Sequence, residues 1–346
     1  MVTFPSATVR DCVAVLERFF PPSWAESWDA VGLAVGDLDA PASAVLFAVD
    51  PTPEVAAEAV TAGAQLLVTH HPLFLRGVHG VAETGPGGRV VATLIRAGVA
   101  LYTVHTNADV AAPGVSDALA DALGLRDVAP LSAPAPLSAP ANVGADEGGA
   151  GADEGGAGAD EGGAGADEGG AGADEGGAGA DEGGAGSSAG DEGGVGDEGG
   201  VGGASVCWGL GRIGDLPAAE SLERFCARVV RALPATAGGV RATGTADRLV
   251  RRIAVCGGSG GELVAAAEAA GADVLVTADG RHHHVLDAVG AHGVVVVDVA
   301  HWASEWPWLS QAATRLHTGL RARGRTVSTS VSAIVTDPWR VHVPSR

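Results

Sequence analysis

The chain contains the same short α/β segment twice. Residues 62–69 read AGAQLLVT and residues 270–277 read AGADVLVT, at a constant offset of 208 residues. In both copies a glycine that can end a helix precedes an apolar run typical of a buried strand. Two copies of one segment are expected to adopt one structure. We therefore expect an α/β fold of two similar halves, an internal duplication, with sheets flanked by helices and a cleft between the halves.

Strand and helix signals alternate in each half. The predicted strands are 44–49, 65–68, 100–104, 252–256, 274–276 and 294–297. The predicted helices are 52–61, 88–97, 116–123 and 262–270. The strands are near-continuous runs of Val and Leu, which indicates that helices cover both faces of each sheet.

A segment of unusual composition separates the halves. It opens with a Pro/Ala/Ser stretch and continues with repeats of ADEGGAG, and its eight Asp-Glu pairs supply 16 of the negative charges behind the net charge of −21. Each repeat holds three Gly and no large apolar residue, so the period of seven cannot form a coiled-coil seam. We predict an N-terminal half at 1–129, a disordered acidic insert at 130–203 and a C-terminal half at 204–346. Such a linker binds cations only weakly.

Composition excludes several function classes. All 21 basic residues are Arg, so Schiff-base lysine chemistry and a P-loop lysine are excluded. No basic stripe appears, which disfavours nucleic-acid binding. The four Cys form no C-x-x-C pair, and the chain shows neither a signal-peptide pattern nor an apolar run of about 18 residues. These features favour a cytoplasmic protein with no membrane association.

Histidines and acids follow three of the predicted strands. In open α/β sheets, ligands bind at the carboxyl ends of strands, so we expect these side chains to share the cleft. The predicted metal ligands are His70, His71, Asp109, His301 and Glu305. Imidazole and carboxylate suit Zn, Fe, Mn, Ni or Co, and a bridging carboxylate can hold two divalent ions about 3.5–4 Å apart. Each histidine taken alone is also typical of a surface or satisfied core residue.

Three further motifs have two interpretations each. The triple His282–His284 can face substrate or lie in a polar loop, and Gly257–Gly261 can bind an anion or form a tight turn. The tryptophans can line the cleft or fill the core, and those concerned are Trp28, Trp302, Trp306 and Trp308.

Six motifs, in order along both halves, resemble the GTP cyclohydrolase I type 2 homologue family, proteins with a dinuclear metal centre related to the yeast NGG-interacting factor. The motifs are WDAVGL at 28–33, THHPL at 69–73, HTNAD at 105–109, GRIGDL at 211–216, CGGSG at 256–260 and residues 298–305. The resemblance implies two α/β layers around a bimetal site, assembly as a homohexamer, and the same five ligands. It also implies that His105 supports the ligands without binding metal.

Two functions remain open. The first is a metal-dependent hydrolase of the GTP cyclohydrolase type, acting on a small molecule such as a nucleotide. In it, Glu305 bridges the two ions, a water between them attacks an electrophilic carbon or phosphorus, and His283 or His105 moves protons. The alternative is a non-enzymatic metal-binding protein, such as a metal chaperone or a regulatory scaffold. No base-recognition motif decides between them, and the donor set does not select one metal.

Overall fold

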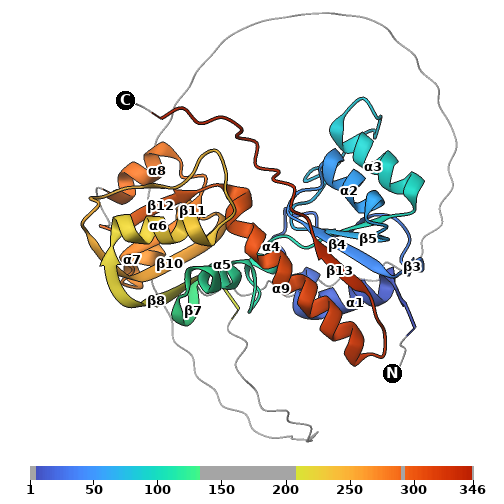
Figure 1. The fold of residues 1–346 in the computed structure, drawn as a ribbon, viewed down its shortest axis with the longest axis horizontal. Helices are drawn as coiled ribbons and strands as arrows, with labels where there is room; N and C mark the ends of the chain where they lie inside the picture. The colour runs from blue at the N-terminus through green and yellow to red at the C-terminus, as the bar shows by residue number, and fades with distance from the viewer. Residues whose placement is uncertain (1–4, 133–207, 290–292, 345–346) are drawn as a thin grey trace, which may run out of the picture. The chain divides into compact units, whose positions relative to one another are not determined.

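The computed structural model describes residues 5–132, 208–289 and 293–344 (Figure 1). All of them belong to one compact unit. The predicted insert at 130–203 lies outside the described residues except for its first three positions, so its assignment stays a prediction. Within the described ranges, two main sheets of five and six strands carry the fold, together with a small sheet that pairs β1 (Ala7–Thr8) with β3 (Pro41–Ala42).

The first sheet has the strand order β13-β4-β5-β6-β2. Its neighbours are parallel except at one edge, where β2 runs antiparallel to β6. The strands are β2 (Gly32–Val35), β4 (Ala44–Ala48), β5 (Leu66–Thr69), β6 (Ala100–Thr103) and β13 (Ser328–Val331).

The second sheet has the strand order β7-β8-β10-β11-β12-β9. Its three central strands are parallel, and the flanking ones are antiparallel. The strands are β7 (Arg126–Ser132), β8 (Leu210–Ser221), β9 (Arg241–Ala242), β10 (Leu249–Ser259), β11 (Val274–Ala278) and β12 (Val295–Val299).

Helices cover both faces of both sheets, as the apolar strands predict. The α-helices are α1 (Val9–Phe19), α2 (Pro53–Thr61), α3 (Pro86–Ala97), α4 (Thr106–Asp109), α5 (Val115–Leu123), α6 (Leu222–Ala232), α7 (Val264–Ala269), α8 (His282–Asp287) and α9 (His301–Ala322). Short 3-10 turns occur at Pro22–Trp24 and Gly261–Leu263. Successive strand residues point to opposite faces. In the first sheet, Leu67 therefore packs with α2 and α3, while Val68 belongs to the core that contains α1 and α9.

The register of the strands confirms the duplication. Val45 pairs with Leu66 in the first sheet and Ile253 pairs with Val274 in the second, so both partners shift by the same 208 residues. The glycine before each of these strands has a positive φ, at +65° for Gly63 and +73° for Gly271. The α/β class and the two similar halves are therefore confirmed.

The two halves of the chain exchange edge strands. Strand β7 starts before the predicted insert and takes in its first three positions, and it pairs with β8 in the second sheet. Strand β13 lies near the C-terminus but pairs with β4 in the first sheet. Helix α9 packs against both β4 and β10, and one core cluster contains residues from both sheets. The N-terminus of α9 therefore lies where the strand ends of the two halves meet (Figure 1).

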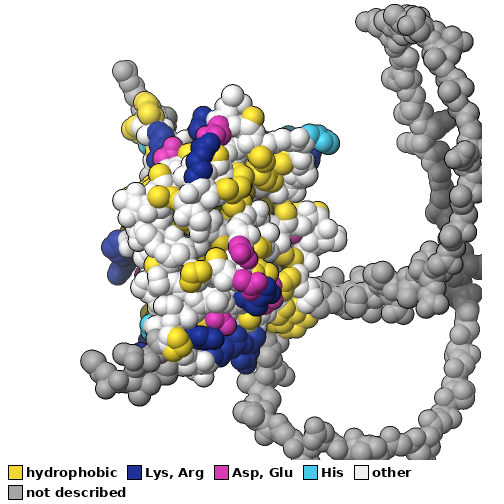
Figure 2. Space-filling model, turned by 90° about the vertical axis from the view of Figure 1, so that its right-hand side faces the viewer, with side chains coloured by type: hydrophobic (Ala, Val, Ile, Leu, Met, Phe, Trp, Pro, Cys, Tyr) yellow, Lys and Arg dark blue, Asp and Glu magenta, His cyan; other side chains and the backbone are white. Residues whose placement is uncertain are grey.

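Two features expected from the sequence concern the surface and the helices, namely the lack of a basic stripe and the lack of a membrane span. Figure 2 shows one face of the molecule, where arginine side chains form small groups next to acidic ones rather than a continuous basic strip. Among the helices of the described ranges, none has the length and apolar character needed to cross a bilayer.

Candidate metal centre

Glu305 lies at the centre of a cluster of imidazoles. His70 and His71 follow β5, and His301 begins α9 with Glu305 one turn later. One carboxylate oxygen, Oε1, lies 2.8 Å from His301 Nε2 and 3.4 Å from His70 Nε2. The other, Oε2, lies 3.3 Å from His71 Nε2. Side chains separated by more than 230 positions thus meet at one carboxylate.

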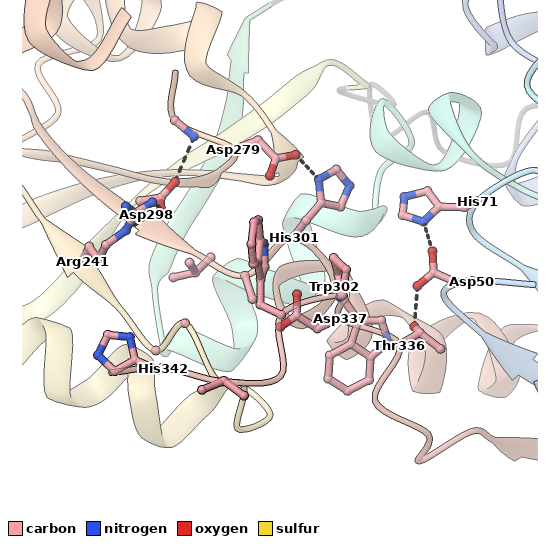
Figure 3. A pocket seen from close by; sticks show the side chains of 18 residues that line it. Asp50, His71, Arg241, Asp279, Asp298, His301, Trp302, Thr336, Asp337 and His342 are labelled. Carbon is pink, nitrogen blue, oxygen red and sulfur yellow. Dashed lines mark hydrogen bonds and ion pairs between the residues drawn. The ribbon is translucent and has the colours of Figure 1, made fainter. Parts of the chain in front are cut away.

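All four histidines of the cluster are oriented through Nδ1. The Nδ1 atoms lie against the Val104 carbonyl for His70 (3.0 Å), Asp50 for His71 (2.7 Å), Asp29 for His105 (2.8 Å) and Asp279 for His301 (2.7 Å). Figure 3 shows the His71–Asp50 and His301–Asp279 pairs. A second partner of this kind fixes the tautomer and leaves Nε2 as the free donor, which is the usual arrangement of metal-binding histidines.

The donor atoms form two groups that share His71. His71, His301 and Glu305 make one, and His70, His71 and His105 make the other, with the donor atoms of each group within 4.8 Å of one another. Asp109, at the end of α4, belongs to neither group, although its carboxylate lies 3.7 Å from His70 Nε2. The structure thus brings all five predicted ligands together and adds His105 as a sixth donor.

The cluster is strongly charged without metal. Burial raises the pKa of Glu305, but the three surrounding imidazoles outweigh burial and hold it well below its usual range. For His301, burial lowers the pKa, and the carboxylates of Glu305 and Asp279 more than reverse this, raising it to about 10. Glu305 is only 2% exposed, and its Oε2 makes no hydrogen bond among the described residues. A buried, anionic carboxylate with one oxygen that faces an imidazole nitrogen without a hydrogen bond fits a divalent metal ion.

The charge of His301 gives a pH-dependent prediction. A pKa raised from 6.5 to about 10 in the folded state stabilises the metal-free protein fully below pH 6.5, and this contribution is lost as the pH rises through 10. We expect the melting temperature of chelated wild type to fall between pH 7 and pH 10 by more than that of His301→Asn. Metal-loaded protein should lack this difference, because metal replaces the proton. If the melting temperatures of the two chelated proteins fell equally with pH, this would contradict the raised pKa assigned to His301.

The glycine-rich segment packs against Glu305, and three of its backbone N–H groups already have partners. Its backbone N–H groups donate to side-chain hydroxyls, those of Gly257 to Ser116 (3.3 Å), Gly258 to Ser304 (2.8 Å) and Gly260 to Thr277 (2.8 Å). Gly258 has a φ of +69°, and a Cβ there would lie 2.6 Å from Glu305 Oε1. The first residues of the segment continue β10 as far as Ser259, and the pairing with β11 shifts register there, so the structure shows an irregular strand end rather than a tight turn. This strand end lies against Glu305.

We expect Gly258→Ala to weaken metal binding by about 10- to 100-fold, the range found when the groups that hold a ligand are disturbed. The added methyl group would displace Glu305 and His301, whose Nε2 lies 3.2 Å from it. Competition with a chromogenic chelator measures the change. Gly261→Ala is the matched control, because its Cβ would meet His284 Nδ1 only at an ordinary 3.9 Å. Equal affinities for the two variants would contradict this role.

The remaining motifs lie in different surroundings. His283 is exposed on α8, its ring stacked edge-on against His282 (5.2 Å), and no hydrogen bond or ion pair in the described part of the chain joins it to the cluster. Trp302 and Trp308 are buried, whereas Trp28 is 55% exposed with its ring 6.1 Å from that of His105. Core and cleft interpretations therefore each hold for some of the tryptophans.

Sequence reasoning missed the three aspartates that orient the histidines. Asp50 lies two residues after the end of β4, and Asp279 follows β11 immediately. Ligand-binding residues gather at the carboxyl ends of strands, so applying this rule to every strand would have selected both aspartates. Asp279 also lies 208 residues after His71, the offset of the duplication. Asp29 lies outside the sheets, and its contact with His105 spans 76 residues.

A cavity of about 710 Å³ opens beside the cluster (Figure 3). Its inner wall includes His71 and His301. Its outer wall includes part of the irregular C-terminal segment, residues 332–344, which we call the C-terminal strap. The volume lies within the usual range for a site that binds a small organic molecule.

Comparison with known families identifies the chain. The model of the Duf34/NIF3 (NGG1p interacting factor 3) family matches residues 7–338. The chain belongs to the Duf34/NIF3 family. Two of the curated relatives of this Duf34/NIF3 chain are named GTP cyclohydrolase 1 type 2 homolog. The protein from Streptomyces coelicolor is 39% identical, covering 97% of this chain and 95% of the relative, and that from Mycobacterium leprae is 41% identical, covering 97% and 96%.

Solved structures give the same fold for the Duf34/NIF3 chain. A Bacillus cereus protein related to NIF3 superimposes with a TM-score of 0.72 at 22% identity, covering 96% of this chain and 98% of the other. A hypothetical protein from Staphylococcus aureus gives a TM-score of 0.71 at 25% identity, with coverage of 97% and 99%.

Proposed function

We propose that this chain binds two divalent metal ions and hydrolyses a small molecule in the adjoining cavity. The observation that carries the proposal is the position of Glu305, a buried carboxylate whose two oxygens both face imidazole nitrogens, and these imidazoles come from both halves of the chain. A structural ion pair needs no such convergence of donors, whereas a metal centre does.

The proposed ligands are His70, His71, Asp109, His301 and Glu305. His105 lies close to His70 and His71, and we place it outside the ligand set because it is the proposed proton carrier. His71 belongs to both donor groups, and the Glu305 carboxylate contacts His70, His71 and His301, so both residues would help to hold the metal. Two divalent ions, when bound, would lower the pKa of a water and polarise the bond to be cleaved.

The chain's own residues orient the site and handle protons. Asp50, Asp279 and Asp29 hold three imidazoles by Nδ1, so that Nε2 faces inward. Of the two proton carriers proposed from the sequence, His105 lies beside the cluster, whereas His283 is exposed on α8. We therefore assign proton transfer to His105, whose ring Asp29 orients through Nδ1.

The finer features of the function are proposals by family resemblance. They are a nucleotide-like substrate of the kind in the relatives' name and a homohexameric assembly. A cytoplasmic location is proposed instead from the cysteine usage of the sequence. Nucleic acid is not a proposed partner.

The test combines metal analysis with turnover. We expect elemental analysis of the full-length protein to give two divalent ions per chain, and a screen of nucleotides, nucleosides and related heterocycles to give metal-dependent hydrolysis that a chelator abolishes. Less than one ion per chain would contradict the metal centre. Two ions with no turnover, and transfer of metal to an acceptor protein, would favour the chaperone alternative instead.

A further inference from the structure

The motif at 211–216 contributes nothing to the metal cluster or to the lining of the cavity, yet it contains a buried arginine. Arg212 lies on β8 and is only 1% exposed. A buried guanidinium is costly unless its N–H groups are paired, so its partners indicate which part of the fold it serves.

The guanidinium of Arg212 is fully paired. Nε and Nη2 contact the two carboxylate oxygens of Asp117, at 2.9 and 2.7 Å. Nη1 donates to the carbonyls of Gly209 (2.5 Å) and Gly211 (2.7 Å), and Nη2 also donates to the carbonyl of Ala111 (2.5 Å). These contacts use every N–H group that a guanidinium has.

The contacts fix the short connection between α4 and α5 at both ends. At its start, the Gly209 N–H donates to the Val110 carbonyl at 2.9 Å, next to the bond that the arginine makes to Ala111. At its end, Asp117 also accepts the Gly114 N–H at 2.7 Å. Helix α5 packs against β8 (Figure 1). Residues of the C-terminal half therefore hold a connection that belongs to the N-terminal half.

Asp109 is the last residue of α4 and directly precedes this connection. Its carboxylate lies 3.7 Å from His70 Nε2, which is too far for a hydrogen bond, so this contact does not hold it in place. The other end of α4 is tied to Asp29, which accepts the backbone N–H of Thr106 at 3.0 Å. The placement of Asp109 therefore depends on backbone bonds at the two ends of α4, one to Asp29 and one to Arg212.

Asp109 lies on one side of the cluster. It is near His70, whereas the donor group of His71, His301 and Glu305 does not include it. A shift of α4 would thus withdraw a carboxylate from the ion on the His70 side and leave the other ion its donors.

We propose that Arg212 is a positioning residue of the metal centre, which holds Asp109 beside His70 through the α4–α5 connection and so sets the affinity of the ion on that side. This inference rests on the proposed function, since it concerns the same two ions. Arg212 acts through the backbone and takes no part in the chemical step.

The test is a titration of metal-free, full-length protein with Zn²⁺ in competition with a chromogenic chelator. Arg212→Lys keeps the positive charge but offers its N–H groups from a single atom, so it cannot replace the fork that joins Asp117 to Ala111. We expect one of the two ions to bind about 10- to 100-fold more weakly and the other to keep its wild-type affinity. Asp109→Asn should weaken the same ion, and the double variant should lose no more than Asp109→Asn alone.

A merely structural role predicts a different pattern. Arg228→Lys is the matched control, because it breaks a bidentate pair with Glu220 that joins α6 to β8, and it should keep both affinities. A folded Arg212→Lys that binds both ions as wild type does, or loses affinity equally for both, would overturn the inference. If circular dichroism shows that Arg212→Lys does not fold, Asp117→Asn tests the same link with the guanidinium in place, and the same selective but smaller loss is expected.

Hydrogen exchange separates this inference from the proposed function, because it needs no metal. In metal-free Arg212→Lys, the amides of residues 105–114 should exchange about tenfold faster than in wild type, as loss of a hydrogen bond to a charged group implies, while those of β5 keep their wild-type rate. Unchanged exchange at 105–114 would overturn the positioning role. Wild type that binds fewer than two Zn²⁺ ions, together with the expected change in exchange, would count against the proposed function instead.

Discussion

Glu305→Gln should remove the metal ions from the protein and leave the fold in place. The amide keeps the size of the side chain but loses the negative charge around which three imidazoles are arranged. Loss of a group that merely orients a ligand costs about 10- to 100-fold in metal affinity, so loss of the central ligand should cost at least 100-fold. Elemental analysis after gel filtration should give less than one ion per chain, and turnover should fall to background.

The matched control is Glu262→Gln, which removes one carboxylate from the exposed 3-10 turn beside the same glycine-rich segment. It should keep wild-type metal content, which shows that the general loss of negative charge is not the cause. Circular dichroism of both variants checks the fold. Two ions retained by Glu305→Gln would contradict the metal centre as drawn.

Trp308→Ala should destabilise the protein by about 3–5 kcal/mol, the usual cost of truncating a fully buried aromatic residue. Trp308 is 1% exposed, and its ring packs edge-on against Phe20 at 5.5 Å and beside His70 at 5.4 Å. The void left by the Trp308 ring would thus lie directly behind His70, one of the proposed metal ligands. Denaturant unfolding of the metal-free protein measures the loss, and metal affinity should fall with it because His70 loses its support.

Trp308→Phe separates packing from hydrogen bonding at this position. The indole N–H of Trp308 has no partner among the described residues, so its removal relieves an unsatisfied donor while most of the ring is kept. We expect a change of no more than about 1.5 kcal/mol in the free energy of unfolding. A loss below 1 kcal/mol in Trp308→Ala would show that α9 does not depend on this contact.

The central strands of the fold, and most of the histidine and carboxylate side chains of the candidate site, could be predicted from local sequence. Continuous apolar runs such as Leu66–Thr69 are buried on both faces, and the rule that ligands gather at the carboxyl ends of strands places His70 and His301 in one cleft. The offset of 208 residues reappears as strand register. The strand expected at 252–256 extends to Ser259 because the glycine-rich segment continues β10. The helix expected at 262–270 begins only at Val264 because residues 261–263 form a 3-10 turn.

The edges of the sheets and the outer wall of the site could not be predicted in this way. Strand β13 reads STSV, a short polar stretch whose pairing with β4 depends on contacts nearly 300 residues apart. The C-terminal strap has no helical or strand periodicity, so nothing local indicates that Asp337 is buried. His105 was assigned a supporting role by resemblance, and only the position of Asp29 shows its Nε2 to be free for the cluster.

The exchange of edge strands makes the two halves mutually dependent. A fragment ending before the insert would carry β7 without β8, its partner, and would lack the β13 edge of its own sheet. The complementary fragment would leave β8 with one edge unpaired and would hold His301 and Glu305 without His70 or His71. Each piece would expose an unpaired strand edge and hold only part of the cluster, so we expect that neither folds on its own and that the sheets and the cluster are completed together.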